Sequence, residues 1–324
     1  MRILITGGTG SFGRALARSV MQLPTTSYGF HRIVIYSRDE QKQSDMAREL
    51  GANEDSPLRF MLGDVRDCDR LRMALNGIDL VVHAAALKIV PKCEYDPMEA
   101  MKTNVLGASN VIQAALQTGV KRVIALSTDK AVAPTNLYGA TKLCADKMFI
   151  SANNLSGSVG DETKCRFSVA RYGNVANSRG SIIPLFREHA NSGVPFPITD
   201  ERMTRFWITL DRATEFILQA LLIMEGGEIF IPKMPSFGIV DLAKAMHPFG
   251  NPELDIIGIR PGEKIHETLI TEHDSRDTIE DDNAFVVCPP WAKPDGSRLP
   301  DGFTYTSGNN PDRLTVNALR GLIP

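Results

Sequence analysis

Residues 3–13 read Ile-Leu-Ile-Thr-Gly-Gly-Thr-Gly-Ser-Phe-Gly, a short apolar run that enters a glycine-rich turn. Gly7, Gly10 and Gly13 lie three residues apart, and glycines spaced in this way let a backbone come close to a pyrophosphate. The helix expected to begin at Ser11 would present free N–H groups and a partial positive charge to that anion. The stretch therefore predicts a dinucleotide-phosphate loop after a first strand. The predicted contact residues are Gly7, Thr9, Gly10, Ser11, Phe12 and Gly13.

Apolar strands alternate with helices through the first half of the chain. This alternation indicates a parallel sheet that is covered on both faces and joined by right-handed crossovers. We therefore expect an α/β fold with a doubly wound parallel sheet, the Rossmann architecture. The expected strands are Arg2–Thr6, His31–Ser37, Leu58–Val65, Asp79–Ala86, Lys121–Thr128 and Arg166–Val175. The expected helices are Ser11–Leu23, Glu40–Leu50, Asp69–Leu75, Asp96–Thr118 and Tyr138–Asn154.

The alternation ends near Asn177, after which prolines become frequent. A chain of 324 residues is long enough for two domains. We expect residues 1–175 to form a dinucleotide-binding Rossmann domain and residues 176–324 to form a smaller, mixed α/β substrate-binding cap. A helix predicted over Asp211–Met224 is expected to pack back onto the first domain.

Charge and cysteine content limit the possible partners. The chain has 36 basic and 38 acidic residues, so neither nucleic acid nor an anionic membrane is an expected partner. The five cysteines have no paired spacing, which indicates free thiols in a reducing compartment, and we expect a cytoplasmic protein. No apolar run approaches the ~20 residues of a membrane span, and the first residues do not resemble a signal peptide. The six histidines show no metal-binding spacing, so no metal is expected.

The end of the second strand distinguishes NAD from NADP, because a carboxylate there binds the ribose 2′-hydroxyl and a cation accepts a 2′-phosphate. Ser37 can donate a hydrogen bond and Arg38 can pair with phosphate, with Lys42 one turn further on. Asp39, a carboxylate, favours NAD instead, but on balance we expect NADP. Further cofactor contacts are predicted at Asp64, Val65, Ala84, Ala85, Ala86, Lys88, Leu126, Ser127 and Tyr172.

Tyr138 and Lys142 lie four residues apart at a helix start, and therefore on one face of that helix. The Lys142 charge is expected to hold a nicotinamide ribose and to lower the pKa of the Tyr138 phenol, which could then take a proton from an alcohol. Thr128, at the end of the preceding strand, can orient the same oxygen. These three residues predict a nicotinamide-dependent redox step.

Several motifs together resemble the extended short-chain dehydrogenase/reductases that act on nucleotide sugars: GGTGSFG at 7–13, Ser-Thr-Asp at 127–129 and YGATK at 138–142. Sugar-nucleotide 4,6-dehydratases generally carry Thr-Asp-Glu where this chain has Thr-Asp-Lys at 128–130. That difference resembles the inverting UDP-N-acetylglucosamine 4,6-dehydratases, which open the pseudaminic-acid route to surface sugars. The resemblance runs from residue 1 to about residue 287. Its other motifs are HAAALK at 83–88, RYGNV at 171–175, MTRFWITL at 203–210 and IRPGEK at 259–264.

The resemblance implies a sequence of steps on UDP-N-acetylglucosamine. Oxidation of C4 to a ketone would make the C5 hydrogen acidic enough for a base to remove it. Lys130 is the candidate base and is expected to be neutral, because burial, Lys142 and a cationic nicotinamide disfavour another positive charge. Asp129 would protonate the departing C6 hydroxyl, with a pKa raised by burial. Hydride return to C6 and reprotonation of C5 from the opposite face would give the L-arabino 4-keto-6-deoxy sugar.

The substrate's diphosphate requires cations, which Arg205 and Arg260 could supply, while Glu263 could hold the uridine ribose. The predicted substrate contacts are Lys88, Asn174, Val175, Arg205, Arg260 and Glu263. Three alternatives remain open: a UDP-sugar 4-epimerase, which needs no acid–base pair, a dehydratase that also epimerises C3, and a non-catalytic NADP-sensing module. The resemblance also implies a homo-oligomer built from dimers, such as a hexamer. Its candidate interface is one apolar face of the helix predicted over Asp96–Thr118, formed by Met98, Met101, Val105, Ala108, Ile112 and Ala115.

Overall fold

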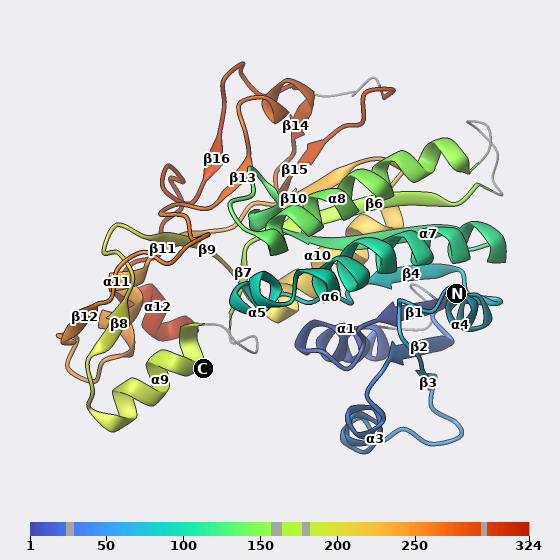
Figure 1. The fold of residues 1–324 in the computed structure, drawn as a ribbon, viewed down its shortest axis with the longest axis horizontal. Coiled ribbons are helices and arrows are strands. Elements are labelled where there is room, and N and C mark those ends of the chain that lie inside the picture. Colours follow the sequence, from blue (N-terminus) through green and yellow to red (C-terminus); the bar gives the residue numbers. More distant parts are fainter. Residues whose placement is uncertain (24–28, 157–163, 177–181, 293–296, 324) are drawn as a thin grey trace.

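The computed structural model describes residues 1–23, 29–156, 164–176, 182–292 and 297–323, and its centre is a nine-stranded sheet (Figure 1). The strands of this sheet are β1 (Arg2–Thr6), β2 (Arg32–Ser37), β3 (Leu58–Leu62), β4 (Leu80–His83), β5 (Arg122–Thr128), β6 (Arg166–Tyr172), β10 (Ile229–Pro232), β14 (Thr278–Glu280) and β15 (Ala284–Val287).

The first six strands pair in parallel in the order β3-β2-β1-β4-β5-β6. The direction of winding reverses between β1 and β4, and in such sheets a ligand crevice forms at the carboxyl ends of the strands beside the reversal. On the other side of β6, β10 adds in parallel, and β15 and β14 follow as antiparallel edge strands. The predicted α/β fold with a doubly wound, mainly parallel sheet is thus confirmed.

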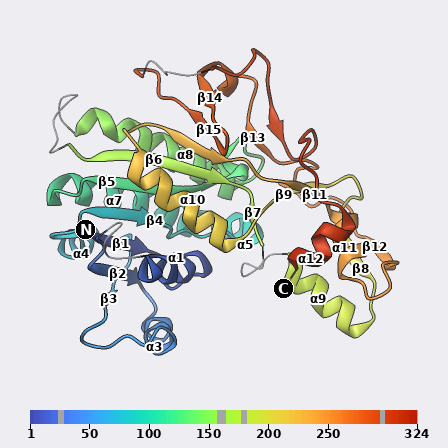
Figure 2. The same ribbon diagram turned by 180° about the vertical axis from the view of Figure 1, so that it is seen from behind.

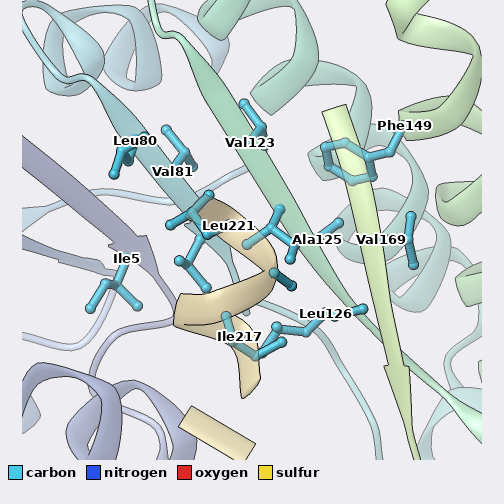
Figure 3. Close-up of a cluster of buried hydrophobic side chains, with 14 of the residues drawn as sticks. Ile5, Leu80, Val81, Val123, Ala125, Leu126, Phe149, Val169, Ile217 and Leu221 are labelled. Carbon is cyan, nitrogen blue, oxygen red and sulfur yellow. The ribbon is translucent and has the colours of Figure 1, made fainter. Parts of the chain in front are cut away.

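Helices cover both faces of this sheet. They are α1 (Ser11–Gln22), α3 (Glu40–Glu49), α4 (Cys68–Leu75), α5 (Val90–Tyr95), α6 (Pro97–Met101), α7 (Gly107–Thr118), α8 (Leu137–Ala152) and α10 (Leu210–Ile223). Helices α7 and α8 lie in front of the sheet in Figure 1, and α10, which packs against α1, lies in front of it in Figure 2. Figure 3 shows Ile217 and Leu221 of α10 among core side chains of the strands, including Ala125 and Leu126. A helix from beyond residue 176 thus covers the sheet built by the first half of the chain.

The helix predicted over Asp96–Thr118 is present from Pro97 to Thr118, but it is not α-helical throughout. Between α6 and α7 the chain forms a π-helical segment, η1 (Lys102–Leu106). A π-turn takes one more residue than an α-turn, so the side chains that follow are rotated by about 100°. Ala108 and Ile112 consequently point into the core, whereas Met98 and Met101 are 59% and 43% exposed. The six apolar positions therefore do not form one continuous face.

The predicted strand Arg166–Val175 is in fact two strands. It breaks at Gly173, where an added Cβ would lie 2.5 Å from Cβ of Phe206. The continuation, β7 (Asn174–Val175), pairs with β9 (Thr204–Ile208) in a second sheet instead of extending β6. Because β6 and β7 are almost consecutive, the chain passes from the central sheet directly into the smaller lobe.

The smaller lobe lies beside the carboxyl ends of the central strands (Figure 1). Its core gathers aromatic side chains that include Phe186, Phe196, Trp207 and Phe237. None of the described helices, in either lobe, is long and apolar enough to cross a membrane. The remaining elements are β8 (Phe196–Ile198), β11 (Ser236–Gly238), β12 (Leu254–Ile256), β13 (Thr268–Ile270), β16 (Tyr305–Thr306), α9 (Ile182–Ser192), α11 (Ile239–Met246), α12 (Val316–Leu322) and the short helical turns η2 (Asp129–Ala131), η3 (Asn153–Leu155) and η4 (Asp274–Asp277).

Candidate active site

A cavity of about 820 Å³ opens at the carboxyl ends of β1, β2, β4, β5 and β6. All the residues predicted to contact the cofactor line this cavity, as do Thr128, Asp129, Lys130, Asn174 and Val175. β3 and β4 end earlier than predicted, so Val65 and Ala84–Ala86 reach the wall from loops. The structure thus brings these residues together, and their individual contacts with a ligand stay predictions.

The glycine loop forms the floor of the cavity. Gly7 has a φ of +64°, and an added Cβ there would lie 2.8 Å from the Cα of Ala85. The N–H of Gly10 donates to the carbonyl of Gly7, which closes a tight turn before α1. Gly10 occupies the N-cap position without a capping side chain, so the first turn of α1 keeps N–H groups available at the cavity wall. This arrangement fits the diphosphate of a dinucleotide.

The end of β2 places a cation at the rim. The Arg38 side chain is 56% exposed, with a nitrogen 3.7 Å from a carboxylate oxygen of Asp64. Asp39 caps α3 by accepting from the Lys42 N–H at 3.0 Å, and it also pairs with the Lys42 ammonium at 2.6 Å. These bonds hold the pKa of Asp39 below its usual range. The Asp39 carboxylate is therefore already engaged, while Arg38 is held only loosely.

The acid–base residues lie where β5 meets α8. Thr128 ends β5, Asp129 and Lys130 form the turn η2, and Tyr138 and Lys142 follow in the first turns of α8. A Cβ on Gly139 would lie 2.1 Å from the carbonyl oxygen of Lys130, so only glycine lets this turn pack directly on the helix. That contact sets Lys130 beside the helix that carries Tyr138.

Asp129 is 1% exposed and accepts hydrogen bonds from Thr128 Oγ1 at 2.9 Å and Lys130 Nζ at 3.1 Å, both at Oδ1. Burial raises the pKa of its carboxyl, as predicted, although Lys130 acts in the opposite direction. Its other oxygen, Oδ2, has no partner among the described residues. A buried acid with one unpaired oxygen at a cavity wall is suited to proton donation.

The protonation state of Lys130 differs from the prediction. Lys130 Nζ lies 3.1 Å from Asp129 Oδ1 and 3.1 Å from Oε1 of Glu267, a residue that the sequence analysis did not single out. Burial acts to lower the pKa of Lys130, but the two carboxylates outweigh it and hold the pKa above its usual range. Lys130 is therefore an ammonium in this structure, and the expectation of a neutral amine is wrong for this state of the protein.

The pKa of the Tyr138 phenol, which we expected the Lys142 charge to lower, also differs from the prediction. Burial raises the pKa of the Tyr138 phenol to about 12, and the charge that opposes this is that of Lys130. Burial lowers the pKa of Lys142, while Asp146 acts against this. Asp146 in turn accepts from Ser127 Oγ at 2.6 Å and lies 3.6 Å from Arg171. Lys142 thus belongs to a buried network with Asp146, which carried no motif in the sequence, and Arg171, the first residue of the RYGNV motif.

Three predicted substrate residues lie away from the cavity wall. Arg205 donates to the carbonyls of Thr204 and Ile265, and its Nε lies 3.7 Å from Glu267. Arg260 and Glu263 belong to a segment that docks on the start of α8, with Arg260 55% exposed. In this structure the Arg205 guanidinium therefore pairs with Glu267. Contact of Arg205 or Arg260 with a diphosphate, and of Glu263 with a ribose, remains a prediction.

The segment around Arg260 nonetheless contacts the start of α8, the helix that carries Tyr138 and Lys142. Asn136 caps α8 by accepting from the Gly139 N–H at 2.8 Å, and its amide donates to the carbonyl of Gly262, also at 2.8 Å. Thr135 Oγ1 donates to the same carbonyl at 3.0 Å. The IRPGEK motif is thus joined to the turn that precedes Tyr138. Within the described residues, no three His, Cys, Asp or Glu side chains gather in a way that could hold a metal ion.

Comparison with known proteins agrees with this geometry. A Campylobacter jejuni protein named UDP-N-acetylglucosamine 4,6-dehydratase (inverting) is 47% identical over 99% of this chain and 96% of its own length. A Rickettsia prowazekii protein named UDP-glucose 4-epimerase is 44% identical over 84% of this chain and 78% of its own length. The crystal structure of Pen from Bacillus thuringiensis superposes with a TM-score of 0.89 and 36% identity, covering 99% of this chain and 96% of that one.

Residues 3–289 match the family described as polysaccharide biosynthesis protein. This match spans most of the chain and contains every motif on which the sequence resemblance rested. The Campylobacter jejuni relative carries the name of the group that the sequence resembled, so that prediction is confirmed. The chain belongs to the polysaccharide biosynthesis protein family, within the extended short-chain dehydrogenase/reductases.

Proposed function

We propose that this protein is a configuration-inverting, NADP-dependent UDP-N-acetylglucosamine 4,6-dehydratase. The observation that carries the proposal is the pair of buried Asp129 and partly buried Lys130, which lie with Tyr138 at the wall of the cavity that the glycine loop also lines. An enzyme that only oxidises and reduces C4 has no use for a second acid–base pair. The relatives of the same family support the substrate class.

The protein's own residues divide the work as follows. A nicotinamide bound in this cavity would supply the hydride chemistry for oxidation at C4 and reduction at C6. Tyr138 accepts the C4 hydroxyl proton when it is a phenolate, Lys130 removes the proton from C5 when it is a neutral amine, and Asp129 protonates the departing C6 oxygen when it is protonated. Burial raises the pKa of Asp129, although Lys130 acts in the opposite direction, and this makes the carboxyl a better proton acceptor and donor than an exposed aspartate. The inverted product follows if C5 regains its proton on the face opposite to the one that lost it.

Preference for NADP rests on the end of β2. Asp39, the carboxylate that could bind a 2′-hydroxyl, is occupied by the α3 cap and by Lys42. Arg38 is largely exposed and can turn to a 2′-phosphate, and Ser37 lines the same part of the cavity. An exposed guanidinium beside an engaged carboxylate favours the phosphorylated cofactor.

Incubation of the protein with UDP-N-acetylglucosamine and NADP, without added reductant, tests the proposal. We expect a product lighter by one water, about 18 mass units, with one deuterium at C5 in heavy water and no net NADPH. An isobaric product would instead support the 4-epimerase that the Rickettsia relative's name suggests. A change of configuration at C3 would indicate the dehydratase/epimerase, and an unchanged sugar would indicate a sensing module.

The product would be the first intermediate of pseudaminic-acid-type surface sugar synthesis, made in the cytoplasm. All five cysteines are free thiols, which is consistent with a reducing compartment. We also propose a homo-oligomer. Tyr95, Met98, Met101 and Leu106 expose apolar side chains along α5, α6 and η1, and such a patch is typical of a subunit contact.

A further inference from the structure

Glu267 lies just before β13, far in sequence from the acid–base pair, yet its carboxylate is in contact with that pair. The residue is 2% exposed. Its Oε1 lies 3.1 Å from Lys130 Nζ, the same distance that separates Lys130 from Asp129. Its Oε2 has no hydrogen-bond partner among the described residues. Lys130 is thus held between two buried carboxylates, one of which has an oxygen to spare.

The position of Glu267 is fixed by the last part of the chain. The Glu267 N–H donates to Ser307 Oγ at 2.9 Å, and the Ser307 N–H donates to the Glu267 carbonyl at 2.8 Å. Ser307 Oγ also donates to the carbonyl of Thr204 at 3.1 Å. A backbone held by both of its polar groups fixes where the side chain begins, and burial of the side chain limits where its carboxylate can lie. The fold therefore holds Glu267 in contact with Lys130.

We propose that Glu267 is the positioning residue for Lys130: it holds the ammonium in place at rest and takes its proton when Lys130 acts on C5. The proposal rests on the dehydratase function proposed above. In the step, an N–H bond of Lys130 breaks and an O–H bond forms on Glu267. The freed amine then takes the C5 proton, and the C5–H electrons pass into the enolate of the C4 ketone. The enolate electrons next form the C5–C6 double bond as the C6–O bond breaks, and Asp129, in its protonated form, gives its proton to the departing oxygen.

The charges around Glu267 explain the resting state. Lys130 and Asp129 face it from η2, Arg205 from β9, and Lys264 from the segment before β13. Burial acts to raise the pKa of Glu267, but Lys130, Arg205 and Lys264 outweigh it and keep the pKa below its usual range. Without substrate, the proton therefore stays on Lys130.

Substrate binding changes this balance. The Lys130 side chain is 24% exposed and lines the cavity, so a sugar bound there removes its remaining water. Loss of water penalises an ion pair more than a neutral pair of the same atoms. Covering the site thus favours proton transfer from Lys130 to Glu267, which makes Lys130 a base only when a substrate is present.

The test compares Glu267→Gln with Glu272→Gln, the same chemical change at an exposed neighbour. At pH 7 we expect Glu267→Gln to take up deuterium at C5 at least tenfold more slowly than wild type, with recovery as the pH rises, because water then removes the Lys130 proton. The burst of reduced cofactor from C4 oxidation should change less than twofold, and Glu272→Gln should match wild type throughout. Three results for Glu267→Gln would overturn the proposal. They are a loss of C5 deuterium uptake that is equal at all pH values, a loss of C4 oxidation together with C5 deuterium uptake, and C5 deuterium uptake at the wild-type rate.

A second measurement does not depend on turnover. The ¹⁵N signal of Lys130 Nζ, assigned by its absence in Lys130→Met, should stay that of an ammonium from pH 6 to pH 10 in wild type. In Glu267→Gln it should titrate within that range, and Glu267→Asp serves instead if the amide variant does not fold. If the Lys130 Nζ signal of Glu267→Gln stayed that of an ammonium over the same pH range as in wild type, the contact between Lys130 and Glu267 would be disproved. If wild type yields no dehydrated sugar while this shift is seen, the proposed function fails and the Lys130–Glu267 pairing stands.

Discussion

Gly7 has the most demanding backbone position of the phosphate loop. Its φ of +64° disfavours any side chain, and an added Cβ would press on Ala85. Gly51, at φ +61°, has the same conformation with nothing within 4 Å of an added Cβ. The two glycines thus separate the cost of backbone strain from the added cost of crowding the Ala85 backbone at the cavity wall.

We expect Gly7→Ala to weaken NADPH binding at least tenfold, which corresponds to about 1.4 kcal/mol. Gly51→Ala should lower the free energy of unfolding by about 1 kcal/mol and leave NADPH binding unchanged. Fluorescence titration with NADPH, with urea unfolding of both variants, measures the two effects. Equal NADPH affinity in Gly7→Ala and wild type would contradict the assignment of this loop to the diphosphate.

Helices and strands followed from the sequence where a segment's own periodicity decided its structure. The strands β1, β2 and β5 and the helices α1, α3 and α8 fall close to their predicted bounds. The predictions failed where contacts with a distant segment determine the local structure. The π-turn at Lys102–Leu106 interrupts a helix whose sequence reads as continuous, and Phe206 forces the break after Tyr172. Glu267 reaches Lys130 from a segment far along the chain, a contact that no local pattern could reveal.

The N-terminus of α8 carries a prediction at the scale of an element. Asn136→Ala removes both the cap on Gly139 and the bond to Gly262, so we expect a loss of about 1 kcal/mol in the free energy of unfolding and a lower kcat. Asn136→Asp keeps the capping oxygen but cannot donate to Gly262. It should retain wild-type stability while kcat still falls. Thermal unfolding and steady-state rates distinguish the two, and a fully active Asn136→Asp would show that the Gly262 contact does not matter.

For the whole molecule, the pH dependence of stability should reflect His83. This residue is 2% exposed, its Nδ1 lies 2.8 Å from Thr6 Oγ1, and burial, with help from Lys142, lowers its pKa to about 3. In the unfolded chain the pKa is about 6.5. Below that value the unfolded state binds a proton that the folded state refuses, so stability present above pH 6.5 is lost as the pH falls towards 3.

We expect His83 to cost about 2 kcal/mol at pH 5 relative to pH 7. His83→Asn offers an oxygen to Thr6 and does not titrate, so its urea midpoint should fall less than that of wild type over the same interval. Comparing the two proteins cancels the contributions of the other titrating groups. Parallel slopes for both would mean that His83 is protonated in the folded state.

The order in which the site is assembled follows from where its parts lie in the chain. Among the described residues, those that line the cavity end at Leu210, whereas Ser307, the anchor of Glu267, comes much later. During translation the nucleotide pocket therefore emerges from the ribosome well before the support of the base. A nascent polypeptide could capture its dinucleotide early, and elimination chemistry would begin only after synthesis has reached the tail.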